Sequence, residues 1–256
     1  MKPENINKLL KPLAWYKNLN SHKGRAEARA FLVEGERAVK QIADFHSNEI
    51  IEILSTARMS SLLPKLPLRV ITEKQIATIS STRTSQGIVA VVRLPARVYS
   101  DELPSSPGPR ILLLEDVQDP GNVGTIIRTA AAFGFSGLIM SEKTADPFSA
   151  KAVQSTAGSI LSLWIRRTEN YLKLAGSLSG NGYKLVAADL NGKSDASILQ
   201  GISRLVLALG NEASGLGSAL LSTADYRIRI PVNREKAESL NVAACGAILM
   251  YLASGA

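Results

Sequence analysis

The sequence predicts an α/β protein in two parts, a small α/β domain followed by a larger domain built on a mainly parallel sheet. Three observations support this prediction. Short apolar runs alternate with helix-like segments in the second half of the chain, a proline-rich stretch precedes them, and the excess positive charge lies before that stretch. A chain of 256 residues is long enough for one large domain or two smaller ones.

The proline-rich stretch divides the chain. Its sequence, VYSDELPSSPGP at residues 98–109, contains three prolines and no apolar periodicity, so we expect a linker there. The first domain is then expected at residues 1–97 and the second at residues 110–256. The first domain holds 16 Lys and Arg against 8 Asp and Glu, whereas the rest of the chain holds 14 of each. Such segregated charge favours a nucleic-acid-binding surface, and a basic surface that only aids solubility is the alternative.

Composition narrows the class of protein further. No apolar run approaches the roughly 20 residues that span a bilayer. The first 30 residues are polar and basic without the apolar core of a secretory signal, so we expect a cytoplasmic protein with no membrane partner. One cysteine and two histidines argue against a disulfide framework or a zinc site, and we expect no metal.

One helix and three strands are predicted in the first domain. Residues 31–45 place Val33, Ala38 and Ile42 at helical spacing, which predicts a helix. Apolar runs predict strands at residues 49–56, 68–72 and 87–94. The last run is almost wholly apolar, so we expect it in the centre of a sheet.

In the second domain, strands and helices alternate. Strands are predicted at residues 110–116, 137–141, 163–167, 183–190, 204–212 and 226–232. Helices are predicted at residues 122–133, 148–161, 170–182 and 239–254. Alternating βα units of this kind indicate a mainly parallel sheet with helices on both faces.

The first unusual segment is NVGTIIRTA at residues 122–130, directly after a strand and a turn. Gly121 and Gly124 allow a close approach of backbone or ligand, and the side chain of Asn122 can cap the helix. Arg128 lies four residues after Gly124 among apolar neighbours. Its guanidinium either extends to solvent or is directed at an anion, and the spacing alone leaves both readings open.

The second unusual segment is LGNEASGLG at residues 209–217. A strand runs here into a loop with three glycines and one carboxylate, Glu212. Open α/β sheets bind ligands at this carboxyl end of their strands. A plain turn from strand to helix is the alternative, because a glycine-rich loop alone is a weak signal.

The third unusual segment begins at Ile230 and Pro231 and continues, after a polar stretch, with the sequence ESLNVA at residues 238–243. Ser239 is predicted as the N-cap of the last helix. Asn241 would then stand in the first turn of that helix, which is unusual because Asn is a poor helix former.

In this order, the three segments resemble the SpoU (TrmH-like) family of RNA ribose 2′-O-methyltransferases, in the SPOUT superfamily. The shared patterns are Asn-x-Gly-x-x-x-Arg-x-Ala, Leu-Gly-Asn-Glu-x-x-Gly-Leu, and Ile-Pro followed by Ser-Leu-Asn-Val. The resemblance covers residues 110–254. FLVEGERAV at residues 31–39 and TSQGIVAVV at residues 84–92 are similar to a substrate-binding domain of many members, itself similar to a ribosomal-protein RNA-binding fold. The segment 232–238 departs from the family, which usually has a Gly and one residue fewer there.

The resemblance implies a deep trefoil knot in the second domain, a homodimer, and S-adenosylmethionine as methyl donor. It also implies an RNA substrate, ribosomal RNA in preference to transfer RNA. The residues expected to bind the cofactor are Leu209, Gly210, Asn211, Ile230 and Leu240. The residues expected to surround the reacting groups are Asn122, Arg128, Glu212, Ser239 and Asn241.

Methyl transfer to a ribose hydroxyl requires in-line placement and removal of a proton. Cys245, on an apolar helix, is the only Cys or His of the second domain, so the usual general base is absent. Arg128 does not serve as a base, because a guanidinium stays protonated in proteins. We expect Arg128 to be a fixed charge that lowers the pKa of the hydroxyl and binds the adjacent phosphate, with the proton passing to water or Glu212.

Two other functions stay open at this point. A non-catalytic RNA-binding or ribosome-assembly protein would keep the basic domain, but would not need Asn122, Arg128 and Glu212 together. A nucleotide-dependent Rossmann enzyme needs an acidic ribose ligand about 20 residues beyond the glycine turn. Met140 and Ser141 stand there instead.

Overall fold

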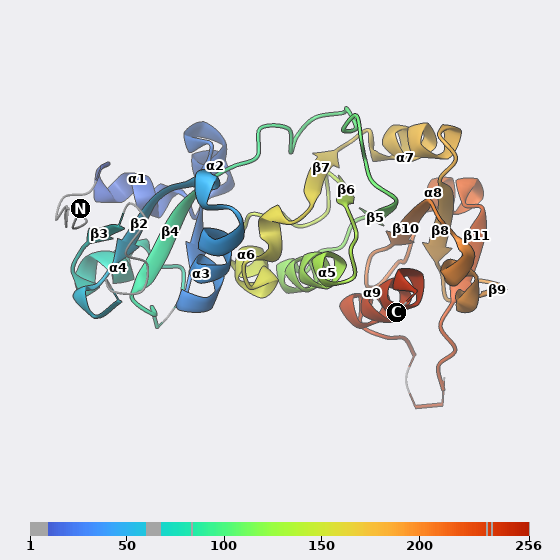
Figure 1. Cartoon of the computed structure of the whole chain (residues 1–256). Coiled ribbons are helices and arrows are strands. Elements are labelled where there is room, and N and C mark those ends of the chain that lie inside the picture. The colour runs from blue at the N-terminus through green and yellow to red at the C-terminus, as the bar shows by residue number, and fades with distance from the viewer. Residues whose placement is uncertain (1–9, 60–67, 83, 234, 237, 256) are drawn as a thin grey trace. The chain divides into compact units, whose positions relative to one another are not determined.

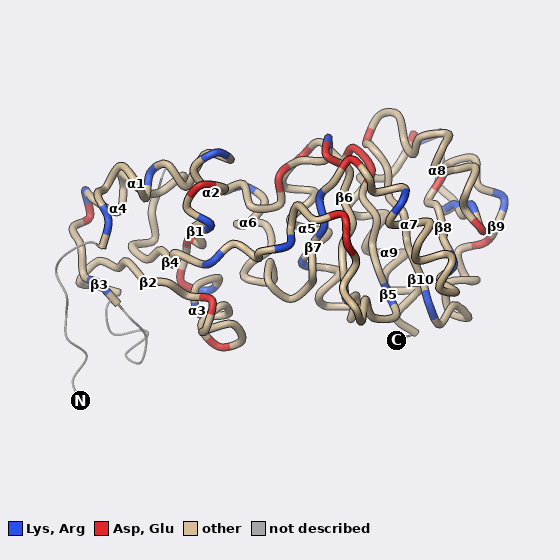
Figure 2. Tube along the Cα trace, turned by 90° about the horizontal axis from the view of Figure 1, so that it is seen from above, with Lys and Arg blue, Asp and Glu red and all other residues tan. Residues whose placement is uncertain are grey.

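The computed structural model describes residues 10–59, 68–82, 84–233, 235–236 and 238–255 (Figure 1). By its internal contacts the chain divides into two compact units, and each carries both basic and acidic side chains (Figure 2). The first comprises the chain up to residue 96 together with residues 146–161, and the second comprises the rest. Residues 146–161 therefore fold with the first unit, although they lie within the second predicted domain. The functional boundaries expected from the sequence stay a prediction.

The first unit contains a four-stranded sheet in the order β1-β4-β2-β3. The strands are β1 (Ala30–Glu34), β2 (Ile50–Ser55), β3 (Leu68–Val70) and β4 (Ile88–Arg93). β4 lies between β1 and β2 and is antiparallel to both. All its residues except the terminal Arg93 are buried, as expected for its apolar sequence.

The helices beside this sheet include α1 (Leu13–Asn18), α2 (His22–Ala28), α3 (Glu36–Phe45) and α4 (Glu73–Ile79). The helix expected at residues 31–45 is wrong in its first third, where the chain forms β1. Gly35, with φ of 95°, separates β1 from α3, and only glycine adopts this conformation readily. Val33 fits both helical spacing and strand alternation, so periodicity did not separate the two.

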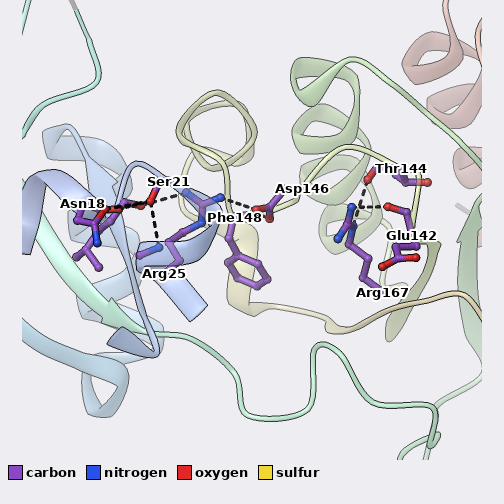
Figure 3. A network of polar contacts seen from close by, with 10 residues as sticks. Asn18, Ser21, Arg25, Glu142, Thr144, Asp146, Phe148 and Arg167 are labelled. Carbon is purple, nitrogen blue, oxygen red and sulfur yellow. Dashed lines mark hydrogen bonds and ion pairs between the residues drawn. The ribbon is translucent and has the colours of Figure 1, made fainter. Parts of the chain in front are cut away.

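Residues 146–161 are held to the first unit by an ion pair and by ring packing. Arg25 is buried and pairs with Asp146, whose second carboxylate oxygen accepts the N–H of Phe148 at 2.8 Å (Figure 3). The rings of Phe148 and Phe31 meet edge to face with 5.0 Å between centroids. These contacts attach the middle of the chain to α2 and β1.

This segment is less helical than expected for residues 148–161. Helix α6 (Ala150–Thr156) ends where Ala157 and Gly158 adopt positive φ, and a 3-10 turn follows at Ser159–Leu161. A Cβ on Gly158 would lie 2.9 Å from the Cβ of Gln41 on α3. The close approach of the two segments therefore requires glycine at this position.

The second unit contains a seven-stranded sheet in the order β7-β6-β5-β10-β8-β11-β9, in which every neighbouring pair is parallel. The strands are β5 (Arg110–Leu114), β6 (Gly137–Ser141), β7 (Trp164–Thr168), β8 (Lys184–Ala188), β9 (Ser194–Asp195), β10 (Leu205–Leu209) and β11 (Tyr226–Arg229). The predicted α/β fold with a parallel sheet is confirmed. β10 enters between β5 and β8 and is buried along its whole length.

The helices of this unit include α5 (Pro120–Ala132), α7 (Tyr171–Gly180), α8 (Ser218–Thr223) and α9 (Val242–Ser254), with a 3-10 helix η4 (Ala196–Gly201). α9 follows the last strand and packs against α5 (Figure 1), and it packs against η4 as well. Arg167 on β7 donates to the carbonyl oxygens of Glu142 and Thr144, which fixes the loop after β6 (Figure 3). The trefoil knot stays a prediction.

Two helix starts differ from the sequence predictions. α5 is capped by Asp119, which accepts the N–H groups of Gly121 and Asn122 at 2.6 and 3.1 Å, and not by Asn122. Pro120 follows at the first helical position, where its missing N–H costs nothing. α9 is capped by Asn241 and not by Ser239. Asn122 therefore lies in the first turn of α5, and Asn241 lies directly before α9.

Candidate active site

A pocket of about 310 Å³ lies in the second unit at the carboxyl ends of β8, β10 and β11, beside the start of α9. It is lined by all five residues expected to bind the cofactor: Leu209, Gly210, Asn211, Ile230 and Leu240. Glu212 and Ser239 line it as well. Its size and its place at the strand ends are those of a small-molecule site in an open α/β sheet.

The inner wall of the pocket is apolar. Leu209, Leu216 and Leu249 are buried lining residues, and such a surface suits the flat face of a nucleobase. The loop after β10 turns back tightly, since a Cβ on Gly210 would lie 2.3 Å from the backbone carbon of Gly215. Glycine at position 210 therefore allows the loop to close on itself at this point.

The side chain of Asn211 organises this loop. Its Nδ2 donates to the carbonyl oxygen of Asp116 at 2.8 Å, and its Oδ1 accepts the N–H groups of Ala213 and Ser214 at 2.9 and 3.0 Å. Both ends of the amide are thus engaged within the protein. The backbone N–H and carbonyl oxygen of Asn211 pair with Gly215, both at 3.0 Å, so Asn211 holds the loop closed. Its expected cofactor role stays a prediction.

A carboxylate stands at the edge of the pocket, held by neutral donors. Glu212 accepts hydrogen bonds from Asn122 Nδ2 at 2.9 Å, from the N–H of Gln118 at 3.2 Å and from the N–H of Asp119 at 3.4 Å. Partial desolvation raises the pKa of Glu212, but these hydrogen bonds outweigh it and leave the pKa below its ordinary value. Glu212 is therefore ionised at neutral pH.

Asn241 extends this cluster from the other side. Its Nδ2 donates to Asn122 Oδ1 at 3.1 Å, and its Oδ1 accepts the N–H groups of Ala243 and Ala244. The orientation of each amide follows from its neighbours, because Asn122 must present Nδ2 to the carboxylate and Oδ1 to Asn241. Three residues from three separate motifs thus form one hydrogen-bonded chain, Asn241 to Asn122 to Glu212.

The other two predicted catalytic residues are placed differently. Ser239 is exposed on the pocket wall, and its hydroxyl makes no hydrogen bond within the described part of the chain. Arg128 is exposed on α5 and does not line the pocket. Its guanidinium forms no ion pair or hydrogen bond with any described residue. The structure thus joins Asn122, Glu212 and Asn241 but leaves Arg128 apart from them.

Sequence reasoning missed several groups that shape the site. The backbone N–H groups of Gln118 and Asp119 bind Glu212, and the Asp-Pro pair at the start of α5 was a usable signal for this turn. Glu115 is buried and accepts the N–H of Gly217 and the hydroxyl of Tyr171, at 2.6 and 2.5 Å. It fixes the far end of the loop that begins at Gly210.

Few described side chains are suited to metal binding or to nucleophilic catalysis. Within the described residues no group of three or more His, Cys, Asp or Glu side chains could hold a metal ion. Cys245 lines the pocket, but burial raises the pKa of its thiol to about 11, so it is protonated at neutral pH. None of the helices described is long and apolar enough to cross a membrane.

Comparison with known proteins identifies the family. The profile of the SpoU rRNA methylase family matches residues 109–251, more than half of the chain. The chain belongs to this family. An MRM3-like substrate binding domain matches residues 14–90. The family predicted from the three motifs is therefore confirmed.

Relatives agree over nearly the full length. The 23S rRNA (guanosine(2553)-2'-O)-methyltransferase RlmP of Bacillus subtilis is 33% identical over 92% of this chain and 93% of its own. An AdoMet-bound rRNA methyltransferase from Sinorhizobium meliloti has a TM-score of 0.79 and 31% identity, covering 97% and 96% of the two chains. The SpoU methyltransferase AviRb from Streptomyces viridochromogenes, in complex with AdoMet, has a TM-score of 0.80 and 26% identity over 94% and 95%.

These findings confirm the predicted enzyme class and cofactor: the chain is an RNA methyltransferase of the SpoU family that uses S-adenosylmethionine. The residues of the pocket fit that cofactor. An apolar wall suits adenine, and the ionised Glu212 suits a sulfonium. The expected contacts of individual residues with the cofactor stay predictions.

Proposed function

We propose that this protein methylates the ribose 2′-hydroxyl of a nucleotide in ribosomal RNA, in the cytoplasm and as a homodimer. The observation that carries the proposal is the hydrogen-bonded chain Asn241–Asn122–Glu212 at the edge of the pocket. A protein that only bound RNA would not need three motifs to converge beside a cofactor pocket. The RNA class follows the relatives named as 23S rRNA and rRNA methyltransferases.

When bound, S-adenosylmethionine would supply a methyl group on a sulfonium, with the neutral thioether S-adenosylhomocysteine as the leaving group. The apolar wall and the loop at Gly210 bind its adenosine part, and Glu212 presents a negative charge near the cation. Asn122 and Asn241 hold that carboxylate in one orientation through their amides. Placement of reactants in this way removes much of the entropic cost of the reaction.

Arg128 provides the positive charge for the RNA side of the reaction. A guanidinium stays protonated, so it lowers the pKa of a nearby ribose hydroxyl and binds the adjacent phosphate without itself accepting a proton. The proton then goes to water or to Glu212. The lowered pKa of Glu212 makes it a weak base, which favours water as the acceptor.

The homodimer is supported by the surface of α9. This helix contains no charged residue, yet Ile248 and Tyr251 are 41% and 50% exposed. Glu212 and Arg128 are exposed as well, and charges of this kind act strongly only in a water-excluded site. A second copy that covers α5 and α9 would both bury the apolar side chains and shield the site.

A methylation assay tests the proposed function. The protein is incubated with labelled S-adenosylmethionine and unmodified transcripts of 23S rRNA, 16S rRNA or transfer RNA, and the methylated position is mapped by resistance to alkaline cleavage. The expected result is one alkali-resistant position in ribosomal RNA, absent with Glu212→Gln. Base methylation, or methylation of transfer RNA alone, would contradict the proposal, and sedimentation of the same protein as a monomer would contradict the homodimer.

A further inference from the structure

Among the described residues, some charged side chains of the pocket lining have no partner of opposite charge. The lining contains two carboxylates, Asp189 and Glu212, and two guanidinium groups, Arg227 and Arg229. Asp189 Oδ2 accepts hydrogen bonds from Arg227 Nε and Nη2 at 2.8 and 2.5 Å. The two charges of this ion pair neutralise one another. Glu212 is held by amides and N–H groups, so it keeps its negative charge.

Arg229 is the fourth charged side chain of the pocket lining. It stands at the last position of β11, is exposed, and makes no hydrogen bond or ion pair with any residue that the structure describes. It also borders a second hollow, lined in part by Glu235, and no ion pair joins these two side chains. A cation that lines a ligand pocket without a protein partner is available to an anionic group of the ligand.

Arg229 and Glu212 lie at the carboxyl ends of two strands that are not neighbours in the sheet. Glu212 follows β10 and Arg229 ends β11, and β8 lies between these two strands. Two strand spacings separate the backbones by roughly 10 Å. The pocket therefore offers a free negative charge and a free positive charge at two separate positions.

We propose that Arg229 binds the α-carboxylate of the methionine part of S-adenosylmethionine. The cofactor carries a sulfonium and a carboxylate on one short chain, and the two free charges of the pocket match them in sign. Such pairing selects the orientation of the methionine part within the pocket. This inference rests on the use of the cofactor in this pocket and adds a residue outside the motifs that define the family resemblance.

An RNA phosphate is the other anion that Arg229 could meet. Its place in the lining of the cofactor pocket, next to Ile230, favours the cofactor carboxylate. Two adenosine ligands separate the possibilities, because S-adenosylhomocysteine carries the carboxylate whereas methylthioadenosine lacks the amino-acid part altogether. A labelled single-stranded RNA oligonucleotide reports on phosphate binding.

The test is calorimetric titration of wild type, Arg229→Gln and Arg229→Lys with both adenosine ligands. Because hydrogen bonds to charged groups contribute more than neutral ones but are screened at an exposed site, Arg229→Gln should bind S-adenosylhomocysteine roughly tenfold more weakly. Its affinity for methylthioadenosine should stay within about twofold of wild type, as expected for a contact confined to the carboxylate. Lys173→Gln on α7, which removes an exposed charge outside the pocket, is the matched control.

Each other outcome is decisive. Equal weakening for both ligands would mean that Arg229 supports the pocket in general and would overturn the proposal. Unchanged affinity for S-adenosylhomocysteine, with weaker binding of the RNA oligonucleotide, would assign Arg229 to phosphate. Failure of the wild-type protein to bind either ligand would contradict the proposed function itself, whereas tight wild-type binding with an unaffected variant contradicts only the role of Arg229.

Discussion

Two carboxylates, one in each unit, are stabilised in different ways. Asp146 in the first unit is 14% exposed at its side chain and pairs with the buried guanidinium of Arg25. Glu212 in the second unit is exposed and has only neutral donors, two backbone N–H groups and the amide of Asn122. The charge of Asp146 is cancelled inside the fold, whereas that of Glu212 is oriented and left for a ligand.

The same contrast holds deeper in the two units. Glu52 on β2 is buried beside Arg69, whose Nε lies 2.9 Å from Glu52 Oε2. Glu115, also buried just after β5, is bound among the described residues by Gly217 N–H and the hydroxyl of Tyr171. Glu52 and Asp146 thus have a cation beside them, whereas Glu115 and Glu212 hold the loop after β10 through hydrogen bonds without a counter-charge.

The largest expected effect is on the ion pair. Arg25→Met should lower the free energy of unfolding by about 3 kcal/mol, because it leaves Asp146 poorly solvated without its cation. Chemical denaturation measures this change. The double variant Arg25→Met, Asp146→Leu should recover part of the loss, since both charges are then absent. Cofactor binding at the pocket should persist in each variant, and an Arg25→Met protein as stable as wild type would refute the buried pair.

Arg128 tests the opposite kind of charge, one that has no partner among the residues that the structure describes. Arg128→Ala and Arg128→Lys should both fold with unchanged melting temperature and bind S-adenosylmethionine within a few-fold of wild type. Methyl transfer in a single turnover with saturating RNA should fall by roughly 10²-fold, the scale for one lost transition-state charge contact. Arg128→Lys is included because it keeps the charge but loses the planar fork. A near-wild-type rate for Arg128→Ala would return this residue to a surface role.

Asn241 belongs to both kinds of interaction, since it caps α9 and also holds Asn122. Asn241→Ala should cost about 1 kcal/mol of stability through the lost cap. Asn241→Ser is the control, because Ser restores a cap but does not reach Asn122 in the same way. Methyl transfer should be slow in Asn241→Ala and should stay slow in Asn241→Ser. Stability, in contrast, should recover in Asn241→Ser. Equal melting temperatures for Asn241→Ala and wild type would remove the capping part of this account.

The smallest effect is the pH dependence of stability at Glu212. Its pKa in the folded protein lies below the ordinary value of 4.5, so its ionised form favours the folded state above that pH. The contribution is lost as the pH falls through the folded-state pKa. The difference in melting temperature between wild type and Glu212→Gln should therefore be largest near pH 7 and shrink below pH 4.5. A difference that is constant with pH would refute hydrogen bonding to the ionised carboxylate.

The sequence predicted the second unit better than the first. Strands such as β10 and β6 are largely apolar runs, because both faces of a parallel sheet are covered. The bounds of β6 were right, whereas the strand predicted at residues 204–212 ran three residues too far, because β10 ends at Leu209 and the loop begins there. In the first unit, β1 and α3 were merged, since a five-residue strand offers too few positions to distinguish the two periodicities. Gly35 marked the boundary and was the available signal.

The sequence predicted which residues belong to the site but not how those residues contact one another. The motifs nominated Asn122, Glu212 and Asn241, and the structure shows that these three bind one another. Their bonds join positions up to 119 residues apart, so no local pattern could reveal them. The position of Arg128 outside the pocket, and of Arg229 within it, likewise depends on how strands are ordered and not on spacing along the chain.

Residues 146–161 have a consequence for how such a protein can be cut and recombined. The chain passes from one unit to the other after residues 96, 145 and 161, so no single cut separates them. A truncation at residue 97 would remove the partner of Arg25 and the ring that contacts Phe31. Replacing the first unit by another domain would therefore require transplanting two separate stretches of sequence. In evolution, both stretches would have to change together.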